Sequence, residues 1–335
     1  MTRLSGVRSG RRSRPVRIAL AVSAALAVAA VASAFHQPLR ELDPSARQAS
    51  SEVAGNEIIG IRTFEAPPGL RVDADLEYAV APDGTILTLD VCRPSAPALA
   101  GTSAAVVSVH GGSWARGDKA NADWRNVCLW LASEGFVAAS VNYRLVPDAV
   151  YPAQIDDVAA AVAWLREPAQ LERFDLDPAR IGVFGGSAGG HLAALLGTLG
   201  EGPLDAGSRV AAVAELSGPV GLGLPELDSD AASDWLRGIV GDFLACEPGA
   251  DDEACPQAIE ASATAHVDPT DPPFFIGHAE SEIIPLAQSQ RLADTLGASA
   301  VEVELAVVPG DAHSIGILDE GLRERVAAFL HAHLG

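Results

Sequence analysis

The feature that most constrains the fold is an alternation of short apolar runs with segments of helical period. The apolar runs are nearly uniform, as expected for strands buried on both faces, and occupy residues 104–110, 136–143, 180–185, 210–217, 273–278 and 301–308. Segments of helical period lie between or after them, including residues 121–135, 154–167, 189–200, 286–297 and 322–334. Strands that alternate with helices imply parallel crossovers. We therefore expect an α/β fold with a doubly wound, mostly parallel sheet of about eight strands and helices on both faces.

Two shorter strands are expected before the first crossover. Residues 76–80 and 86–92 flank the turn sequence APDG, and the alternation in ILTLDV is typical of an antiparallel edge strand with one wet face. Residues 220–267 break the alternation, with many Gly, Pro and acidic residues. We expect a small cap inserted there into one α/β domain over residues 76–335, preceded by a tether or loosely packed arm over 35–75.

The first 34 residues are typical of a secretory signal peptide. They carry six Arg and no acidic residue, and an uncharged apolar run closes on the small residues Ala32, Ser33 and Ala34. Cleavage is expected after Ala34. The apolar run approaches the length that spans a bilayer, so an uncleaved membrane anchor is the alternative. In both cases we expect the folded body outside the cytoplasm, secreted or in the cell envelope.

The acidic charge of the chain bears on its partners. The formal net charge is −21 although the N-terminal segment is basic. An acidic body repels nucleic acid and anionic surfaces, so no nucleic-acid partner is expected, and a membrane is a partner only if the N-terminal segment stays attached. The sequence leaves the oligomeric state open.

The four cysteines fit an oxidising compartment. Cys246 and Cys255 flank a polar loop with Pro and Gly, so a local bridge is expected between them. Cys92 and Cys128 form either a second bridge or two buried thiols. Because the sequence contains neither a Cys-x-x-Cys nor a His-x-x-x-His spacing, we expect no structural metal site.

Ser187 lies in a G-x-S-x-G pattern, Gly185 to Gly189, between a predicted buried strand and a helix start. A sharp turn in that context lifts the hydroxyl above the sheet edge, and the glycines allow neighbouring backbone to come close. The helix start directs N–H groups toward nearby negative charge. The alternatives are a Gly-rich turn with a solvent-facing Ser and a phosphate cradle, but no Lys follows the glycines as a P-loop requires. The context favours Ser187 as a nucleophile.

A serine nucleophile needs a base that accepts its proton. His313 lies in the loop after the last predicted strand, at the edge of the sheet where active sites gather, and it follows the serine in the chain order described for this architecture. The remaining candidates lie in less suitable places: the arm, the helix after the serine, the end of the cap and the C-terminal helix, which hold His36, His191, His266, His331 and His333.

The sequence HGGSW follows the predicted strand 104–110 and is a candidate oxyanion loop. Attack on an ester carbonyl produces an oxyanion that needs aimed donors. Gly111 and Gly112 can turn their N–H groups inward, and the N–H of Ala188 completes the donor set. A tight turn without a catalytic role is the alternative, but the pattern occurs together with the serine turn.

These motifs resemble the α/β-hydrolase superfamily, and within it the esterases and lipases similar to hormone-sensitive lipase and to the bacterial feruloyl-esterase-like (BD-FAE) group. The resemblance covers residues 76–335 and rests on HGGSW, VNYRL with YPAQIDDVAAAVAWL, DPARIGVFGGSAGGHLA, PPFFIGH with IIPLAQSQRL, and VVPGDAHS. It implies a carboxylic-ester hydrolase that acts through an acyl-enzyme without metal or organic cofactor. In that scheme Ser187 is the nucleophile, His313 is the base, and Gly111, Gly112 and Ala188 are the oxyanion donors.

The acid of the triad departs from the family pattern. Members usually carry Asp in a pattern like H-G-x-x-D-x-x-V-P, whereas GHAESEIIPLAQS has no Asp and is one residue shorter. We favour Glu282, because a longer side chain offsets the shorter loop. Glu280 is the second candidate, followed by Asp268 and Asp311.

The expected function is an exported serine carboxylesterase for short to medium acyl esters on small molecules or polymers, with residues 220–267 shaping the acyl pocket. The alternatives are a lipase or peptidase of the same fold, and a catalytically silent hydrolase fold that serves as a binding protein.

Overall fold

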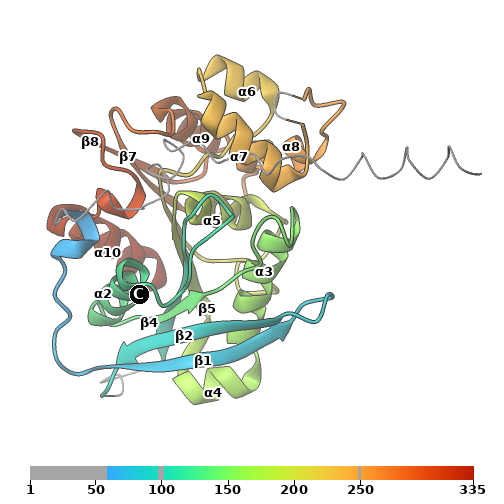
Figure 1. The fold of residues 1–335 in the computed structure, drawn as a ribbon. Helices are drawn as coiled ribbons and strands as arrows, with labels where there is room; N and C mark the ends of the chain where they lie inside the picture. The colour runs from blue at the N-terminus through green and yellow to red at the C-terminus, as the bar shows by residue number, and fades with distance from the viewer. Residues whose placement is uncertain (1–58, 97–101, 248–249) are drawn as a thin grey trace, which may run out of the picture. The chain divides into compact units, whose positions relative to one another are not determined.

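Eight strands form one sheet in the order β1-β2-β4-β3-β5-β6-β7-β8 (Figure 1). The computed structural model describes residues 59–96, 102–247 and 250–335. The pairs β1–β2 and β2–β4 are antiparallel, and the other neighbours are parallel. The strands are β1 (Leu70–Val80), β2 (Ile86–Pro94), β3 (Ser103–Val109), β4 (Val137–Val141), β5 (Leu176–Gly186), β6 (Val213–Leu216), β7 (Phe274–Ala279) and β8 (Val303–Val308). This sheet confirms the predicted fold class.

Helices cover both faces of the sheet, because the central parallel strands such as β3 and β4 are buried on both sides. On one face α2 and α10 bury Trp124, Leu131 and Val326, and on the other α3, α5 and α9 bury Val158, Leu192 and Leu296. The bounds of these helices are α2 (Ala122–Ser133), α3 (Ala153–Leu165), α5 (Ala188–Thr198), α9 (Leu286–Ala298) and α10 (Glu320–Leu334). A further short helix, α4 (Pro168–Phe174), precedes β5.

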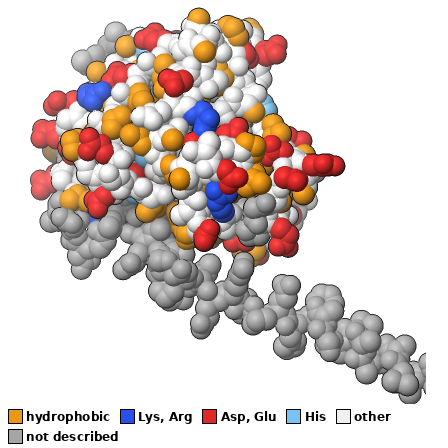
Figure 2. All heavy atoms as spheres, turned by 90° about the horizontal axis from the view of Figure 1, so that it is seen from above, with side chains coloured by type: hydrophobic (Ala, Val, Ile, Leu, Met, Phe, Trp, Pro, Cys, Tyr) orange, Lys and Arg blue, Asp and Glu red, His pale blue; other side chains and the backbone are white. Residues whose placement is uncertain are grey.

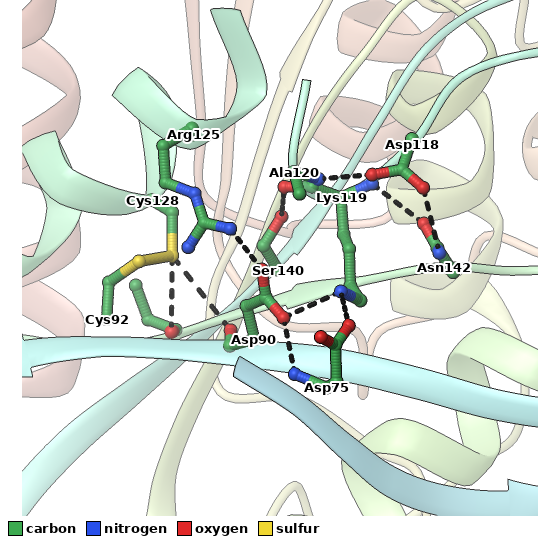
Figure 3. A network of polar contacts seen from close by, with 11 residues as sticks. Asp75, Asp90, Cys92, Asp118, Lys119, Ala120, Arg125, Cys128, Ser140 and Asn142 are labelled. Carbon is green, nitrogen blue, oxygen red and sulfur yellow. Dashed lines mark hydrogen bonds and ion pairs between the residues drawn. A yellow bond between two sulfur atoms is a disulfide. The ribbon is translucent and has the colours of Figure 1, made fainter. Parts of the chain in front are cut away.

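The prediction that β2 is an edge strand with one wet face is wrong. β1 lies at the edge, and α2 covers the polar side of β2, so Asp90 is fully buried. Lys119 donates from Nζ to Asp90 and Asp75 at 2.7 Å each, and Arg125 of α2 also pairs with Asp90 (Figure 3). The polar and apolar residues of β2 therefore alternate because one face of the strand contacts a buried charged network, not because that face is exposed to water.

The charged network sets the ionisation of Asp90. Burial alone would raise the pKa of this carboxyl, but hydrogen bonds from Lys119 and from the backbone N–H of Asp75, together with the charge of Arg125, lower it below its usual value. Burial lowers the pKa of Lys119, which is 3% exposed, but its hydrogen bonds to the carboxylates of Asp75 and Asp90 outweigh this and raise it, so the side chain stays charged. A buried carboxylate therefore fixes the position of a buried ammonium group.

Residues 220–267 between β6 and β7, which we call the cap, form a set of short helices. These are α6 (Leu224–Ser229), α7 (Asp234–Leu244), α8 (Gln257–Glu260) and the 3₁₀ turn η2 (Ala263–Ala265). A disulfide joins Cys246 and Cys255, as expected. Cys92 of β2 and Cys128 of α2 form a second bridge, which resolves the alternative between a bond and two thiols.

Part of the segment assigned to the arm belongs to the folded unit. The 3₁₀ turn η1 (Gly60–Thr63) buries Ile61 completely, and Arg323 of α10 donates to Thr63 Oγ1 at 3.0 Å. β1 begins at Leu70, six residues before the expected strand. The predicted signal peptide lies outside the described residues. Within them, no helix combines the length and hydropathy needed to cross a bilayer.

The view from above in Figure 2 shows one face of the molecule, over which acidic side chains are scattered and outnumber basic ones. This distribution follows the net charge of −21. A surface of this kind favours uncharged or cationic partners over anionic ones.

Candidate active site

Ser187 lies at the sharp turn between β5 and α5. Its φ is +55°, a left-handed value that a residue with a side chain adopts at a cost. The flanking glycines are required here, because a Cβ on Gly185 would lie 2.1 Å from the carbonyl oxygen of Gly189, and one on Gly189 would lie 2.0 Å from that of Val109. The backbone N–H of Ser187 donates to Leu216 O at 2.8 Å. The turn is therefore held against both neighbouring strands.

Two loops bring a histidine and a carboxylate to this serine. His313 Nε2 lies 2.8 Å from Ser187 Oγ, and His313 Nδ1 lies 2.5 Å from Glu282 Oε2. The side chain of Glu282 is completely buried, and that of His313 is 9% exposed. The structure thus brings together the three residues that the sequence proposed, in one line from carboxylate to hydroxyl.

Backbone hydrogen bonds join the loop that carries Glu282, residues 280–285 (the acid loop), to the loop that carries His313. Glu280 N donates to Val308 O at 3.0 Å, and Ser281 N donates to Gly310 O at 3.1 Å. On the other side, Ser314 N donates to Ser217 Oγ at 3.1 Å. The imidazole is therefore placed from both sides by contacts to the ends of neighbouring strands.

The other acid candidates occupy different positions. Glu280 and Asp311 are exposed. Asp268 closes its own turn, because its carboxylate accepts from Thr270 N at 2.6 Å, and this bond contributes to its lowered pKa.

The candidate oxyanion donors lie where β3 ends and α5 begins. Gly111 and Gly112 are buried, and in the described part of the chain their N–H groups donate to no other residue. Ala188 is the first residue of α5, where backbone N–H groups have no acceptor within the helix. The contact of Gly189 with Val109 puts the first turn of α5 directly against the end of β3. The buried Gly111 and Gly112, which follow β3, and the positive end of α5 thus lie close to the turn that carries Ser187.

Trp114 is a residue of this region that the sequence analysis did not single out. It is fully buried in the loop after β3, residues 110–121 (the oxyanion loop), and stacks on Phe243 of α7 with 4.3 Å between ring centroids. Its Nε1–H donates to His191 Nδ1 at 3.2 Å. The HGGSW motif contains this Trp, but nothing in the sequence pairs it with the cap. The cap therefore packs on the oxyanion loop through an aromatic contact.

The remaining histidines have structural contacts. His191 is buried, its Nε2 lies 2.7 Å from Ala261 O, and burial lowers its pKa to about 4. His110 stacks on Tyr143, and burial lowers the pKa of His110 to about 4 as well. His266 Nε2 contacts Glu260 O, while His331 and His333 lie on α10 against Phe136 and Phe329. His36 lies outside the described residues.

A second buried carboxyl, Glu215 of β6, lies below the start of α5. Its Oε2 accepts from Gly218 N at 2.8 Å, and a Cβ on Gly190 would lie 3.0 Å from the same oxygen. The pKa of Glu215 is raised to about 8, because burial and the charge of Glu282 raise it more than the hydrogen bond from Gly218 N–H lowers it. Glu215 is therefore mostly protonated at neutral pH and adds little negative charge beside Glu282.

No group of three or more potential metal ligands is found in the part of the chain that the structure describes. The chemistry open to the residues present is nucleophilic attack by Ser187 with proton transfer through His313.

Comparisons with known proteins agree with this architecture. "Neutral cholesterol ester hydrolase 1" of Rattus norvegicus is 43% identical over 93 residues, 28% of this chain and 23% of that protein. "Esterase LipQ" of Mycobacterium tuberculosis (strain ATCC 25618 / H37Rv) is 28% identical over 306 residues, 90% of this chain and 71% of that protein. The chain therefore spans less than a quarter of the length of the neutral cholesterol ester hydrolase that it matches. Esterase 2 of the Planctomycetes species Thermogutta terrifontis, solved with propionate bound, superposes with a TM-score of 0.61 at 25% identity, covering 79% of this chain and 94% of that one.

A family model gives the broadest assignment. The BD-FAE model matches residues 89–296, from β2 through α9, and so includes Ser187 and Glu282. This match covers more than half of the chain, and the sheet order agrees with it. The chain belongs to the BD-FAE family, within the esterase and lipase group of the α/β-hydrolases.

Proposed function

We propose that the protein is a serine carboxylesterase that hydrolyses short to medium acyl esters. The observation that carries this proposal is the line of contacts from Glu282 through His313 to Ser187 Oγ. A hydroxyl at neutral pH becomes a nucleophile when an adjacent base takes its proton, and this geometry supplies such a base.

In the first half of the reaction Ser187 Oγ attacks the ester carbonyl carbon while His313 Nε2 takes the hydroxyl proton. The carbonyl oxygen becomes an oxyanion that accepts hydrogen bonds from Gly111, Gly112 and Ala188. His313 then gives the proton to the leaving alkoxide, the bond to the alcohol oxygen breaks, and the acyl group stays on Ser187.

In the second half a water molecule attacks the acyl-enzyme with His313 as base. The tetrahedral intermediate collapses, the bond to Ser187 Oγ breaks, and the carboxylic acid leaves as Oγ regains its proton. Through both halves Glu282 holds the imidazole orientation and stabilises its positive charge. No cofactor takes part in these steps.

The comparisons support an ester as the substrate. LipQ is named an esterase, and the Thermogutta terrifontis esterase was solved with propionate, a short carboxylate, bound. In this chain the buried Trp114 of the oxyanion loop stacks on Phe243 of the cap, and we propose that these rings close one side of the acyl pocket and so favour short acyl chains.

We propose further that the protein is exported, with its N-terminal segment removed after Ala34. Two disulfides fit an oxidising compartment and support this location.

The test is turnover of p-nitrophenyl esters of increasing acyl length by the wild type and Ser187→Ala. We expect kcat/KM to be highest for short acyl groups, and Ser187→Ala to lower kcat on the order of 10⁶-fold. A folded Ser187→Ala protein that keeps activity within tenfold of the wild type would overturn the proposal. A strong preference for long, micellar esters would make the enzyme a lipase instead.

A further inference from the structure

The 3₁₀ turn η1, near the start of the described chain, lies against the loop that carries His313. His313 directly precedes a second 3₁₀ turn, η3 (Ser314–Gly316), and its carbonyl oxygen accepts a hydrogen bond from Gly316 N at 2.9 Å. η1 and η3 are in direct contact. A movement of η3 would therefore be passed on to His313 through one turn of backbone.

Gly60 brings the backbone of η1 close to η3. A Cβ on Gly60 would lie 2.3 Å from Ile315 O and 2.4 Å from Gly316 O, so no larger residue fits without moving one of the two turns. The φ of Gly60 is +52°, in the left-handed region that also favours glycine. The close approach therefore depends on the missing side chain.

Three interactions hold η1 on parts of the molecule other than η3. Ile61 is fully buried in the core between the sheet and helices α2 and α10. Arg62 donates two hydrogen bonds to the carboxylate of Asp123 in α2, at 2.9 and 3.0 Å. Arg323 of α10 donates from Nη1 to Gly60 O at 3.3 Å. η1 is thus fixed on two helices and can act as a firm support for η3.

Arg323 also ties η1 to the end of the His313 loop. The same nitrogen, Nη1, donates to Leu318 O at 2.9 Å, two residues after η3. On its other side the loop is held by Ser217, whose Oγ accepts from Ser314 N, and by the acid loop. η1 and Arg323 therefore complete the support of the loop from the side that faces α10.

An open hollow lies next to the contact between η1 and η3. It is lined by Ile59 and Thr63 on one side and by Val308, Pro309 and Ala312 on the other. A loop that borders open space has room to shift, and the backbone of Gly60 limits that shift. The contact at Gly60 thus acts where the loop before His313 is packed least.

We propose that Gly60 is a positioning residue whose close backbone contact with η3 sets the place of His313 between Ser187 and Glu282. This role rests on the proposed function. His313 must lie 2.8 Å from Ser187 Oγ and 2.5 Å from Glu282 Oε2 at the same time. A misplacement of about 1 Å can cost about 100-fold in rate. The match with the BD-FAE model, residues 89–296, includes neither η1 nor His313, so this contact lies beyond the family match.

Two Gly-to-Ala substitutions separate the contact from backbone strain. Gly60→Ala places a Cβ against η3, whereas Gly69 has a positive φ of +92° and a Cβ there would meet no other group within 4 Å. We expect Gly60→Ala to lower kcat for p-nitrophenyl acetate about tenfold to 100-fold with KM within twofold, and Gly69→Ala to keep kcat within about twofold of the wild type. The downfield proton resonance of the His313–Glu282 hydrogen bond should move in Gly60→Ala and stay in place in Gly69→Ala.

Leu165→Ala is the control for lost stability. Leu165 is fully buried at the end of α3, in the core on the other face of the sheet, so the substitution lowers the unfolding temperature away from the His313 loop. Losses of kcat that follow the unfolding temperature across the three variants would overturn the role of Gly60. So would equal kcat values for folded Gly60→Ala and Gly69→Ala.

A second pair of variants decides the matter if Gly60→Ala does not fold. Arg62→Met removes the ion pair with Asp123 and adds no atom to the contact with η3, and Arg71→Met removes the more exposed ion pair with Asp73. Arg62→Met should have the lower kcat at unchanged KM, and equal kcat values would overturn the role of η1. The proposed function fails separately, when the wild type does not hydrolyse esters or when Ser187→Ala is as active as the wild type.

Discussion

The oxyanion loop and the acid loop are held in place by opposite kinds of electrostatics. The oxyanion loop is fixed by permanent charges, since buried Lys119 is paired with Asp90 and Asp75 (Figure 3). The acid loop presents the buried carboxylate of Glu282 to the imidazole of His313 and a backbone N–H. A fixed cation on Glu282 would neutralise the charge that stabilises the imidazolium of His313. Permanent ion pairs thus support the scaffold, while one titratable imidazole and one backbone N–H hold the acid.

The largest expected effect breaks the acid loop. Glu282→Ala should lower kcat about 10⁴-fold, because the imidazole loses both its orientation and the counter-charge that stabilises it. The exposed Glu280, two residues earlier, is the matched control, and Glu280→Ala should keep kcat within about twofold. Ester turnover by both variants measures the difference. Equal small losses would show that Glu282 is not the acid of the triad.

The matching change on the oxyanion side should act on stability first. Lys119→Met leaves Asp90 buried with Arg125 as its remaining side-chain partner, so the free energy of unfolding should fall by about 3 kcal/mol. The exposed Arg325–Glu304 pair is the control, and Arg325→Met should cost less than about 1 kcal/mol. Urea unfolding at pH 7 compares the two variants. A loss of kcat in folded Lys119→Met as large as that of Glu282→Ala would remove the distinction between the two loops.

Glu215 sharpens the comparison, because it is a buried carboxyl without a cation. Its pKa is raised to about 8, so between about pH 4.5 and 8 the folded protein holds a proton that the unfolded chain has released. The free energy of unfolding should therefore fall as pH rises, by up to about 1.4 kcal/mol per pH unit from this group. Glu215→Gln should show a flatter pH dependence and be the more stable protein above pH 8. Parallel curves for variant and wild type would contradict the raised pKa.

The smallest expected effect compares the two disulfides. Cys92–Cys128 closes 36 residues on the scaffold side, and Cys246–Cys255 closes 9 residues in the cap. Chain entropy predicts stabilisation of about 4 and about 3 kcal/mol, respectively. Denaturant unfolding of the two Cys-to-Ala double variants should thus differ by about 1 kcal/mol. A larger cost in the cap would show that chain entropy does not govern these bridges.

The sequence predicts the parallel part of this fold well, because strands buried on both faces leave uniform apolar runs such as 104–110. It fails at β2, since alternation reports that one face is polar and does not report what covers that face. The partners of Asp90 come from Asp75, Lys119 and Arg125, in separate segments that meet only when the sheet forms. No periodicity encodes such a meeting.

The same limit applies at the site. The strand-turn-helix context predicts the turn at Ser187, because the turn itself requires its glycines. A Cβ on Gly185, for example, would lie 2.1 Å from the carbonyl oxygen of Gly189. Glu280 and Glu282 carry the same side chain and differ in where the loop directs them, which the sequence does not report.

The most direct test of the central claim is covalent labelling by a fluorophosphonate followed by peptide mapping. An activated serine reacts with this reagent, so the folded wild type should carry one adduct, on Ser187, and Ser187→Ala should carry none. Glu282→Ala should label far more slowly than Glu280→Ala. A well-folded wild type that stays unlabelled, or that carries its adduct on another residue, would contradict the assignment of Ser187 as a nucleophile activated by His313 and Glu282.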